Sequence, residues 1–401
     1  MLDLPAVRSQ FPALATGAAY FDGPGGSQVP ATVADAIAAT LRAAIANRGT
    51  VTAAERRADG IVEAARQAAA DLLGATASGI VFGRSMTQVT YDMSRALAKG
   101  WRSGDEIIVT SLDHDANIRP WVQAAEAAGV TVRWAEFDPE TCELAPGAVA
   151  RVLSGRTRLV AVTGASNLLG TRPDVPAIAG HAHDAGALVY VDGVHLTPHA
   201  LVDVAALGAD FYACSPYKFL GPHLGLIAAD PRLLETIHPD KLLPASDAVP
   251  ERFELGTLPY ELLAGTTAAV DFLAGLIPAE GSRRARLVAS MTALERYEEG
   301  LRERLESGLA EIPGVTRYGS PGRRRTPTVL FSVDGVPPGA VYERLAERGV
   351  NAPASTFYAV ECSRRLGLGK AGAARAGIAP YTTESEVDLL LAGVAEIAKA
   401  G

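Results

Sequence analysis

The stretch DFYACSPYKFLGPHLG, residues 210–225, places one lysine, Lys218, directly after a short apolar run that has the composition of a buried strand. Lysine side chains are rarely buried, because removing an ammonium group from water is costly unless the charge is paired or the proton is lost. Lys218 therefore either reaches solvent from a loop or supplies an amine for chemistry.

Short runs rich in β-branched and aromatic residues recur on both sides of this stretch, and segments of helical spacing separate them. Near-continuous apolar strands that alternate with helices predict an α/β fold with a mostly parallel sheet covered on both faces. A short loop with Pro216, Gly221 and Pro222 precedes the last run, which allows one antiparallel strand. The expected strands span 79–83, 106–110, 130–137, 158–163, 187–192, 210–215 and 224–229.

From about residue 261 the pattern changes to that of a smaller α+β unit. A long segment with many charges on one face predicts an extended surface helix, and shorter strands and helices follow it. The expected helices span 282–312, 338–348 and 384–399, and the expected strands span 327–333 and 374–380.

The bulk properties narrow the class of protein. The chain of 401 residues has a formal net charge of −8, which argues against nucleic acid or an anionic membrane surface as the main partner. We find no apolar run long enough to span a bilayer and no secretory signal at the N-terminus. Cys142, Cys214 and Cys362 are too widely spaced for a disulfide framework or a metal site. The sequence predicts a cytoplasmic enzyme or binding protein.

Polar side chains follow several of the predicted strands, at the edge of the sheet where ligands of open α/β sheets bind. Ser85 and Thr87 open a helix there and are equally well explained as a phosphate site or as a plain helix cap. A single histidine such as His114 is more often structural. The whole set of polar residues at the strand ends indicates a ligand site more strongly than any one of them does. The set comprises Ser85, Thr87, His114, Asn167, Asp192, His195, Ser215 and Lys218.

A lysine that shares a pocket with a phosphate site and a strand-end carboxylate matches the requirements of pyridoxal 5′-phosphate (PLP). The amine of Lys218 would form an imine with the aldehyde of the cofactor. The carboxylate of Asp192 would keep the pyridine nitrogen protonated, so that the ring can accept electrons from a carbanion. An ammonium group and a carboxylate in one pocket each favour the ionised form of the other.

The runs VYVDGVHLTPH (189–199) and GADFYACSPYKFLGPHLG (208–225) closely resemble the class V aminotransferase family, in particular its cysteine desulfurase-like branch. The resemblance extends from AAYFDGPGGSQVP (18–30) to ARAGIAPYTTESEVD (374–388). It implies the PLP fold-type I homodimer, with a seven-stranded large domain over 16–260. The small domain would combine both chain ends, 1–15 and 261–401.

The resemblance also implies roles for individual residues. Lys218 would be the Schiff-base lysine, Asp192 the partner of the pyridine nitrogen, and His114 the residue that stacks on the ring face. The remaining cofactor contacts would come from Ser85, Met86, Thr87, Asn167, His195, Ser215 and Tyr217, with Gly256 and Thr257 reaching the phosphate of the other subunit. The substrate amino acid would be bound by Arg375, which clamps its α-carboxylate, and by Asn167, Tyr358 and Gly26.

Departures from the family pattern bear on the reaction. His195 stands where the family usually has glutamine, and Tyr217 where it usually has histidine. The desulfurase loop, roughly Arg-x-Gly-His-x-Cys-Ala, corresponds to PASTFYA (353–359), with Tyr358 at the cysteine. A tyrosine cannot form a persulfide, which requires an activated thiolate. Cys362 lies four residues further on, in a segment that looks helical.

These features favour C–S cleavage or β-elimination on a cysteine-like amino acid without a protein persulfide. Transamination, epimerisation and a catalytically silent PLP-binding protein remain alternatives. A nucleotide-binding Rossmann protein is a further alternative, but GLGKAG (367–372) follows a charged segment and not a strand. HAHD (181–184) does not indicate a metal site, because positions two apart on a helix face different sides.

Overall fold

A seven-stranded sheet forms the centre of the computed structural model, which describes residues 2–319 and 324–400. Its strand order is β2-β8-β7-β6-β5-β3-β4. All neighbouring strands are parallel except β8, which is antiparallel to both β2 and β7. The strands are β2 (Ile80–Gly83), β3 (Glu106–Thr110), β4 (Thr131–Ala135), β5 (Thr157–Thr163), β6 (Leu188–Asp192), β7 (Phe211–Cys214) and β8 (Gly225–Ala229). The predicted α/β class and the single antiparallel strand are confirmed.

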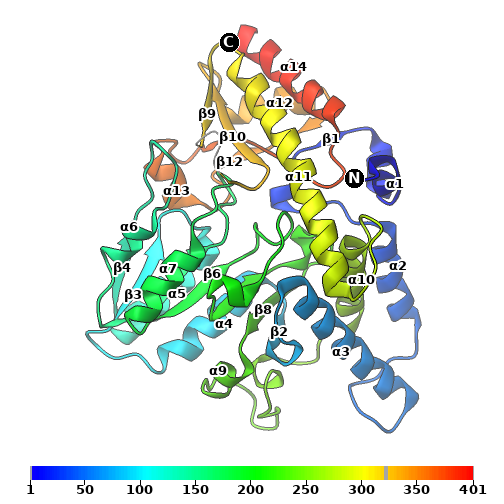
Figure 1. Cartoon of the computed structure of the whole chain (residues 1–401), viewed down its shortest axis with the longest axis vertical. Helices are drawn as coiled ribbons and strands as arrows, with labels where there is room; N and C mark the ends of the chain where they lie inside the picture. The colour runs from blue at the N-terminus through cyan, green and yellow to red at the C-terminus, as the bar shows by residue number, and fades with distance from the viewer. Residues whose placement is uncertain (1, 320–323, 401) are drawn as a thin grey trace.

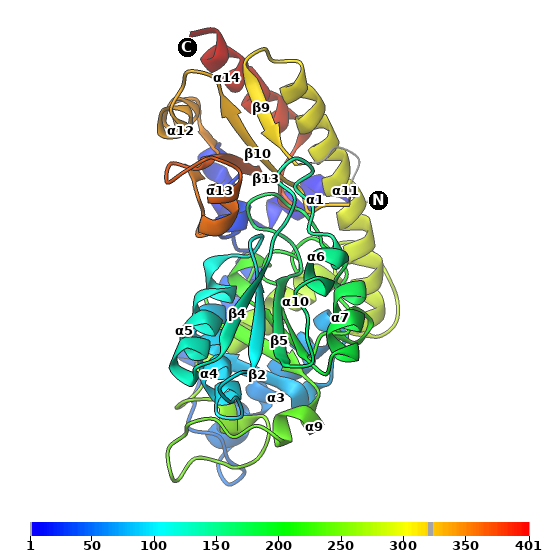
Figure 2. The same cartoon turned by 90° about the vertical axis from the view of Figure 1, so that its left-hand side faces the viewer.

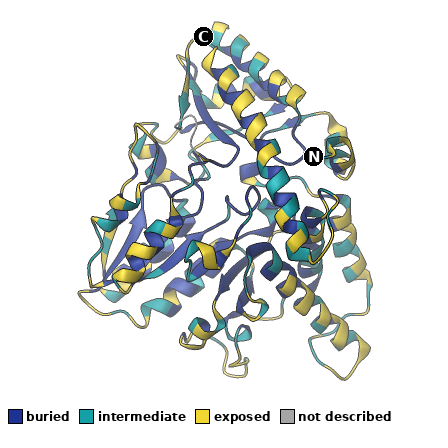
Figure 3. Ribbon diagram, in the orientation of Figure 1, coloured by how far each residue is buried: buried dark blue, intermediate teal, exposed yellow. Residues whose placement is uncertain are grey.

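Helices cover both faces of this sheet (Figure 1). Successive residues of a strand point to opposite faces, so Val189 and Val191 pack in one apolar cluster and Tyr190 in the other. One face is covered by α4 (Met86–Ala98), α5 (Arg119–Ala128) and α9 (Pro231–Glu235), and the other by α3 (Ala53–Leu73), α7 (Val175–Asp184) and α10 (Tyr260–Ala274). Both faces of the sheet are therefore buried from solvent, which explains the near-continuous apolar strand sequences (Figure 3).

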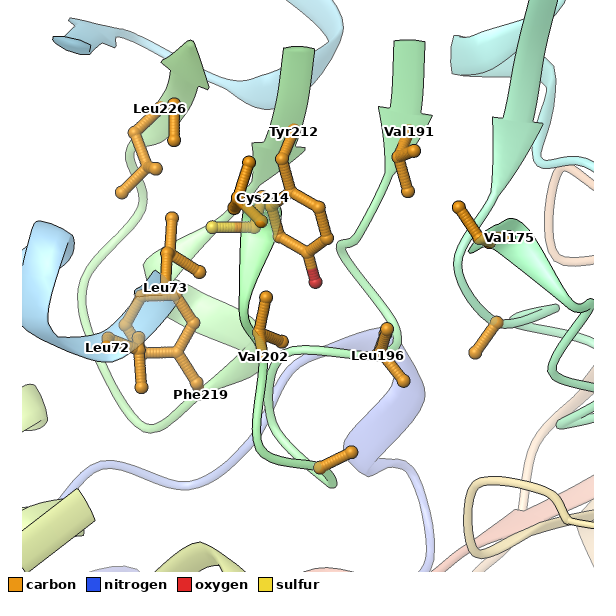
Figure 4. Close-up of a cluster of buried hydrophobic side chains, with 14 of the residues drawn as sticks. Leu72, Leu73, Val175, Val191, Leu196, Val202, Tyr212, Cys214, Phe219 and Leu226 are labelled. Atoms are coloured by element: carbon orange, nitrogen blue, oxygen red, sulfur yellow. The ribbon is translucent and has the colours of Figure 1, made fainter. Parts of the chain in front are cut away.

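The second face can be followed in Figure 4. Val191, Tyr212, Cys214 and Leu226 project from neighbouring strands of the sheet toward Leu73 and the other apolar side chains of that cluster. Each of these five side chains is fully buried. The packing fixes the register of β6 and β7, because a shift by one residue would turn these side chains to the other face.

A smaller unit follows α10, and it holds a four-stranded antiparallel sheet of order β12-β13-β10-β9 (Figure 2). Its core packs side chains of the sheet against α11, α12 and α14. The elements are α11 (Arg283–Ala310), β9 (Val315–Tyr318), β10 (Thr328–Val333), α12 (Pro338–Ala346), β12 (Ala354–Ser355), α13 (Val360–Arg365), β13 (Ala373–Gly377) and α14 (Glu384–Ala400). The predicted long helix and both predicted strands are present.

Both chain ends contribute to the region between the two sheets. β1 (Ala19–Tyr20) pairs in parallel with β11 (Val350–Asn351), and Asp22 forms a bridge with Gly377. These pairings bring the glycine-rich segment after Asp22 beside the strand that carries Arg375. The division at residues 16 and 260 stays a prediction.

The remaining helices are short or lie at the periphery. They are α1 (Leu4–Ser9), η1 (Pro12–Thr16), η2 (Gly23–Gly25), α2 (Ala31–Arg42), η3 (Ala77–Gly79), η4 (Asp115–Asn117), α6 (Pro146–Ala150), α8 (Val204–Leu207), η5 (Pro216–Lys218) and η6 (Glu251–Phe253). Among the described residues, no helix has both the length and the apolar character that a membrane crossing would need.

The carboxyl ends of the parallel strands meet at one edge of the large sheet. Thr163 at the end of β5 is paired with Asp192 at the end of β6, and Asp192 with Ala213 near the end of β7. Segments that leave these strands therefore start side by side, which places their polar residues around a common space.

Candidate active site

A cavity of about 630 Å³ lies at this edge of the sheet. Its walls come from the loops after the parallel strands, the start of α4, the segment at Pro24 and Gly25, and the loop before α13. The predicted site residues that line it are Ser85, Met86, Thr87, His114, Asn167, Asp192, His195, Ser215, Tyr217, Lys218, Tyr358 and Arg375. Segments far apart in the sequence thus form one concave site, as expected for a small-molecule pocket.

Lys218 ends the short helix η5, and its ammonium group points into the cavity wall. Its Nζ donates a hydrogen bond of 2.5 Å to the carbonyl of Pro24 and lies 4.7 Å from the ring centroid of Tyr217. Burial, and secondarily the positive charge of Arg375, lower the pKa of Lys218 from 10.5 to about 7, while Asp192 opposes the shift. A large fraction of this amine is therefore neutral near pH 7, which is the form that can act as a nucleophile or a base.

Asp192 is the last residue of β6 and is 4% exposed. Its Oδ1 accepts a hydrogen bond of 2.9 Å from the backbone amide of Val194. Burial raises the pKa of Asp192 to about 6, against the lowering effects of that amide and of Lys218. The carboxyl group is thus mostly ionised at pH 7 and supplies the negative charge at the floor of the cavity.

His114 caps the short helix η4, where its Nδ1 accepts a hydrogen bond of 3.0 Å from the amide of Ala116. Burial, with the charges of Lys218 and Arg375, lowers the pKa of His114 to about 4. The imidazole is therefore neutral at pH 7 and carries its proton on Nε2. Its ring is stacked with that of Tyr358, with centroids 5.5 Å apart and planes at 28°.

The start of α4 forms the wall around Ser85, Met86 and Thr87. Ser85 is the helix cap, and its Oγ accepts a hydrogen bond of 3.1 Å from Gln88. The cap explanation is therefore correct, and it leaves the Ser85 hydroxyl proton and the first helix amides directed at the N-terminus, where anions bind favourably. Gly225 of β8 packs directly against the backbone of Ser85. A Cβ atom added at Gly225 would come within 2.1 Å of that backbone.

Arg375 is buried in the opposite wall at 1% exposure. Its Nη1 donates a hydrogen bond of 2.8 Å to the carbonyl of Asn167, and its Nε has no partner among the described residues. Burial lowers the pKa of Arg375 to about 9, and the nearby carboxylate of Asp22 opposes the shift. The guanidinium is charged at pH 7 and keeps donors free for an anion.

Two aromatic residues complete the cavity. His195 pairs through Nε2 with Thr328 Oγ1 at 2.9 Å, and burial lowers its pKa. The ring of Tyr217 is stacked with that of His223, with centroids 4.7 Å apart and planes at 10°. Both side chains have fixed orientations, so they restrict the shape of the pocket.

Three predicted site residues lie outside the cavity of the single chain. Gly26 packs behind it, where an added Cβ would lie 3.4 Å from the ring of Tyr217, and the neighbouring Gly25 lines the cavity instead. Gly256 and Thr257 are exposed on the loop before α10. Cys362 is fully buried in α13, and burial raises the pKa of its thiol, so it is a core residue in this structure.

Several residues that line or contact the cavity were not predicted from the sequence. The carbonyl of Pro24 accepts a hydrogen bond from Lys218, although Pro24 itself was not predicted as a site residue. Arg119 lines the cavity and forms ion pairs with Asp115 and Glu361 at 2.9 and 2.6 Å. Phe357 also lines it, beside the Tyr358 that was singled out. The only signal for these residues was their position within recognised motifs.

The donor set fits PLP. The cavity combines a buried primary amine on Lys218, a carboxylate on Asp192 and a helix N-terminus with hydroxyl groups at Ser85 and Ser215. The amide oxygen of Asn167 is buried without a partner among the described residues, so it is available to a hydroxyl donor. An amine, a carboxylate and a phosphate site in one pocket are what this cofactor requires.

The fold and the site define a protein of the PLP-dependent transferase class, and comparison with known proteins agrees. The profile of the class V aminotransferase family matches residues 19–390. An uncharacterised protein of Mycobacterium tuberculosis is 35% identical over 398 residues, covering 98% of this chain and 99% of the relative. An aminotransferase-like protein of Gibberella zeae is 34% identical over 403 residues, covering 96% of each chain. The apo structure of a cysteine desulfurase from Thermococcus onnurineus superimposes with a TM-score of 0.90 at 26% identity, covering 100% of this chain and 99% of the other.

The chain belongs to the class V aminotransferase family. Enzymes of this family use pyridoxal 5′-phosphate, so the protein is a PLP-dependent enzyme that acts on an amino acid. The predicted family, fold-type I architecture and cofactor are thereby confirmed.

Proposed function

We propose that this PLP-dependent enzyme acts on a cysteine-like amino acid by C–S cleavage or β-elimination, without forming a persulfide on the protein. The observation that carries the proposal is the buried amine of Lys218 in one cavity with Asp192 and Arg375. An amine of lowered pKa, a carboxylate and an arginine with free donors suit an amino acid that must be bound by its carboxylate and deprotonated at its α-carbon.

The cofactor would be held by residues of five different segments. Lys218 would anchor it, Asp192 would pair with its pyridine nitrogen, and the neutral ring of His114 would stack on it. Ser85, Met86, Thr87 and Ser215 would bind the phosphate, with Asn167, His195 and Tyr217 around the ring. When bound, PLP supplies an aldehyde that condenses with primary amines and a ring that accepts electrons from the bond being broken.

The residues of the chain then perform the acid–base and binding work. Lys218 Nζ, with a pKa of about 7, is unprotonated in about half of the molecules at pH 7 and can take up the α-proton of the substrate. Arg375, charged at that pH, would bind the α-carboxylate through a planar pair of donors. Tyr358 would line the side-chain part of the pocket with Gly25, and Gly26 would support it from behind.

The absence of a protein persulfide is proposed from the thiols. The loop at Thr356–Ala359 presents Phe357 and Tyr358 at the cavity, and neither can carry sulfur. Burial raises the pKa of the Cys362 thiol, so the nearest cysteine in the sequence is not an activated thiolate. A sulfur group cleaved from the substrate would therefore leave the site as sulfide or as a thiol.

The test is a spectral screen of amino acids with the holoenzyme, followed by product analysis. Purified protein should be yellow, and borohydride should fix the cofactor on Lys218, as mass spectrometry of peptides would show. Cysteine-like substrates should change the spectrum and release sulfide or thiol together with pyruvate and ammonia, while mass spectrometry finds no persulfide on the protein. A colourless protein that stays unlabelled after PLP is supplied would refute the proposal, and so would a yellow protein whose spectrum ignores every amino acid.

A homodimer and a cytoplasmic location belong to the same proposal. Gly256 and Thr257 are exposed, and Leu242, Leu243 and Leu255 on the same loop region are 71%, 97% and 51% exposed, which supports a partner surface there. All three cysteines are free thiols, as is usual in a reducing compartment. Sedimentation should show a dimer, and a monomer that binds PLP fully would contradict the role of Gly256 and Thr257.

A further inference from the structure

Phe357 covers the guanidinium group of Arg375 in the wall of the cavity. The Arg375 Cζ lies 3.6 Å from the centroid of the Phe357 ring. Arg375 is buried, so water does not compete for the face of the cation, and a cation–π contact is stronger in such a setting. The mechanism described above gives Phe357 no role.

The backbone of the loop is held in an unusual conformation. Phe357 has φ +50° and Tyr358 has φ +59°, in the left-handed region that bulky residues rarely adopt. Such conformations persist only where surrounding contacts impose them, and they concentrate at functional sites. The loop is therefore not simply a relaxed connection between β12 and α13.

Hydrogen bonds from other cavity residues impose this conformation. The Asn167 amide Nδ2 donates to the carbonyl of Phe357 at 2.9 Å, and the amide of Asp115 donates to the carbonyl of Tyr358 at 2.8 Å. The Asn167 carbonyl in turn accepts from Arg375 Nη1 at 2.8 Å. Asn167, Phe357 and Arg375 thus form a closed set of three mutual contacts.

These contacts leave one edge of Arg375 available. The Phe357 ring occupies a face of the guanidinium, and Asn167 occupies Nη1. Nε is buried with no partner among the described residues, and Nη2 lies beside Gly25, where an added Cβ would be 3.8 Å away. A carboxylate binds an arginine in the guanidinium plane, across two donors, so the Nε–Nη2 edge is the one that suits it.

We propose that Phe357 is a positioning residue for the substrate carboxylate, since its ring fixes the guanidinium plane of Arg375 with the Nε–Nη2 edge turned toward the cavity. The assignment rests on the proposed function, because it concerns how the same site recognises its substrate. It adds that the site selects amines that bear a carboxylate and that this selection depends on an aromatic ring at position 357.

The experiment compares two amines that differ only in the carboxylate, L-alanine and ethylamine, on the holoenzyme. Their dissociation constants are measured from the change in visible absorption, which reports binding and not turnover. In Phe357→Leu the dissociation constant for L-alanine should rise about fivefold, while that for ethylamine changes less than twofold. Phe357→Tyr, which keeps the aromatic face, should bind both amines as the wild type does.

Two further variants serve as controls. Tyr342→Leu makes a comparable aromatic-to-leucine change at a 39% exposed position on α12, outside the residues that line the cavity, and should change neither constant. Phe357→Met is a second non-aromatic variant in case Phe357→Leu folds poorly, and it should behave as Phe357→Leu. Cofactor content and thermal melting establish that each variant is intact.

The outcomes separate this assignment from the proposed function. Equal weakening of both amines in Phe357→Leu, or no weakening of either, would overturn the positioning role while the wild-type enzyme still binds amino acids. A wild-type holoenzyme whose spectrum responds neither to these two amines nor to any other amino acid, cysteine included, would overturn the proposed function, and the positioning role with it.

Discussion

The lowered pKa of Lys218 can be measured directly in the apoenzyme. An amine with a pKa of 10.5 is neutral in roughly 1 molecule in 3000 at pH 7, whereas a pKa of about 7 leaves about half neutral. Only the neutral amine attacks trinitrobenzenesulfonate, so the rate of labelling of Lys218 should rise with pH and reach half of its maximum near pH 7. Peptide mass spectrometry follows Lys218 in the protein, and N-acetyl-lysine methylamide serves as the reference amine.

Two variants test the physical cause, because the charges around Lys218 act in opposite directions. Arg375→Gln removes a positive neighbour and should move the labelling midpoint of Lys218 to higher pH. Asp192→Asn removes a negative neighbour and should move it to lower pH. A wild-type midpoint above pH 9, or shifts of the same sign in both variants, would refute the electrostatic reasoning.

Three other predictions concern parts of the chain that support the site. Arg66→Leu removes the ion pair of 2.7 Å and leaves the buried carboxylate of Glu254 unpaired, so urea denaturation should show a free energy of unfolding that is lower by about 3–5 kcal/mol. The control Arg232→Leu removes an exposed ion pair and should have no measurable effect. Gly225→Ala should displace the start of α4 and weaken PLP binding in a fluorescence titration, and unchanged affinity would contradict the phosphate site. Cys362→Ala should retain sulfide release from cysteine-like substrates, and its loss would show that this thiol takes part.

The large sheet could be predicted well because both of its faces are buried. Strands such as β3 and β5 each contain a continuous apolar run, residues 107–109 and 159–162, and helical segments separate them, so their type and order can be predicted from the sequence. β9 was missed, because most of its residues are only partly buried and its sequence has no apolar run. The two-residue strands β1 and β11 are too short to leave any pattern.

The site was predicted where polar residues follow strands within recognisable motifs. Lys218, Asp192, His114 and Arg375 were all named, and all line the same cavity. The contact of Phe357 with Arg375 was not predicted, because nothing in the local sequence of either residue indicates that they meet. The hydrogen bond from Lys218 to the carbonyl of Pro24 joins positions 194 residues apart, and it could not be predicted from the sequence either.

The sequence by itself determined the alternation of strands and helices, the class of the sheet and the identity of the chemical groups at its edge. These features depend on local burial periodicity and on residue type, which the chain carries at every position. Tertiary structure alone decided the protonation of Lys218 and the orientation of Arg375, since burial and neighbouring charges from distant segments set both. Desolvation is a property of the assembled cavity, and no single stretch of the chain contains it.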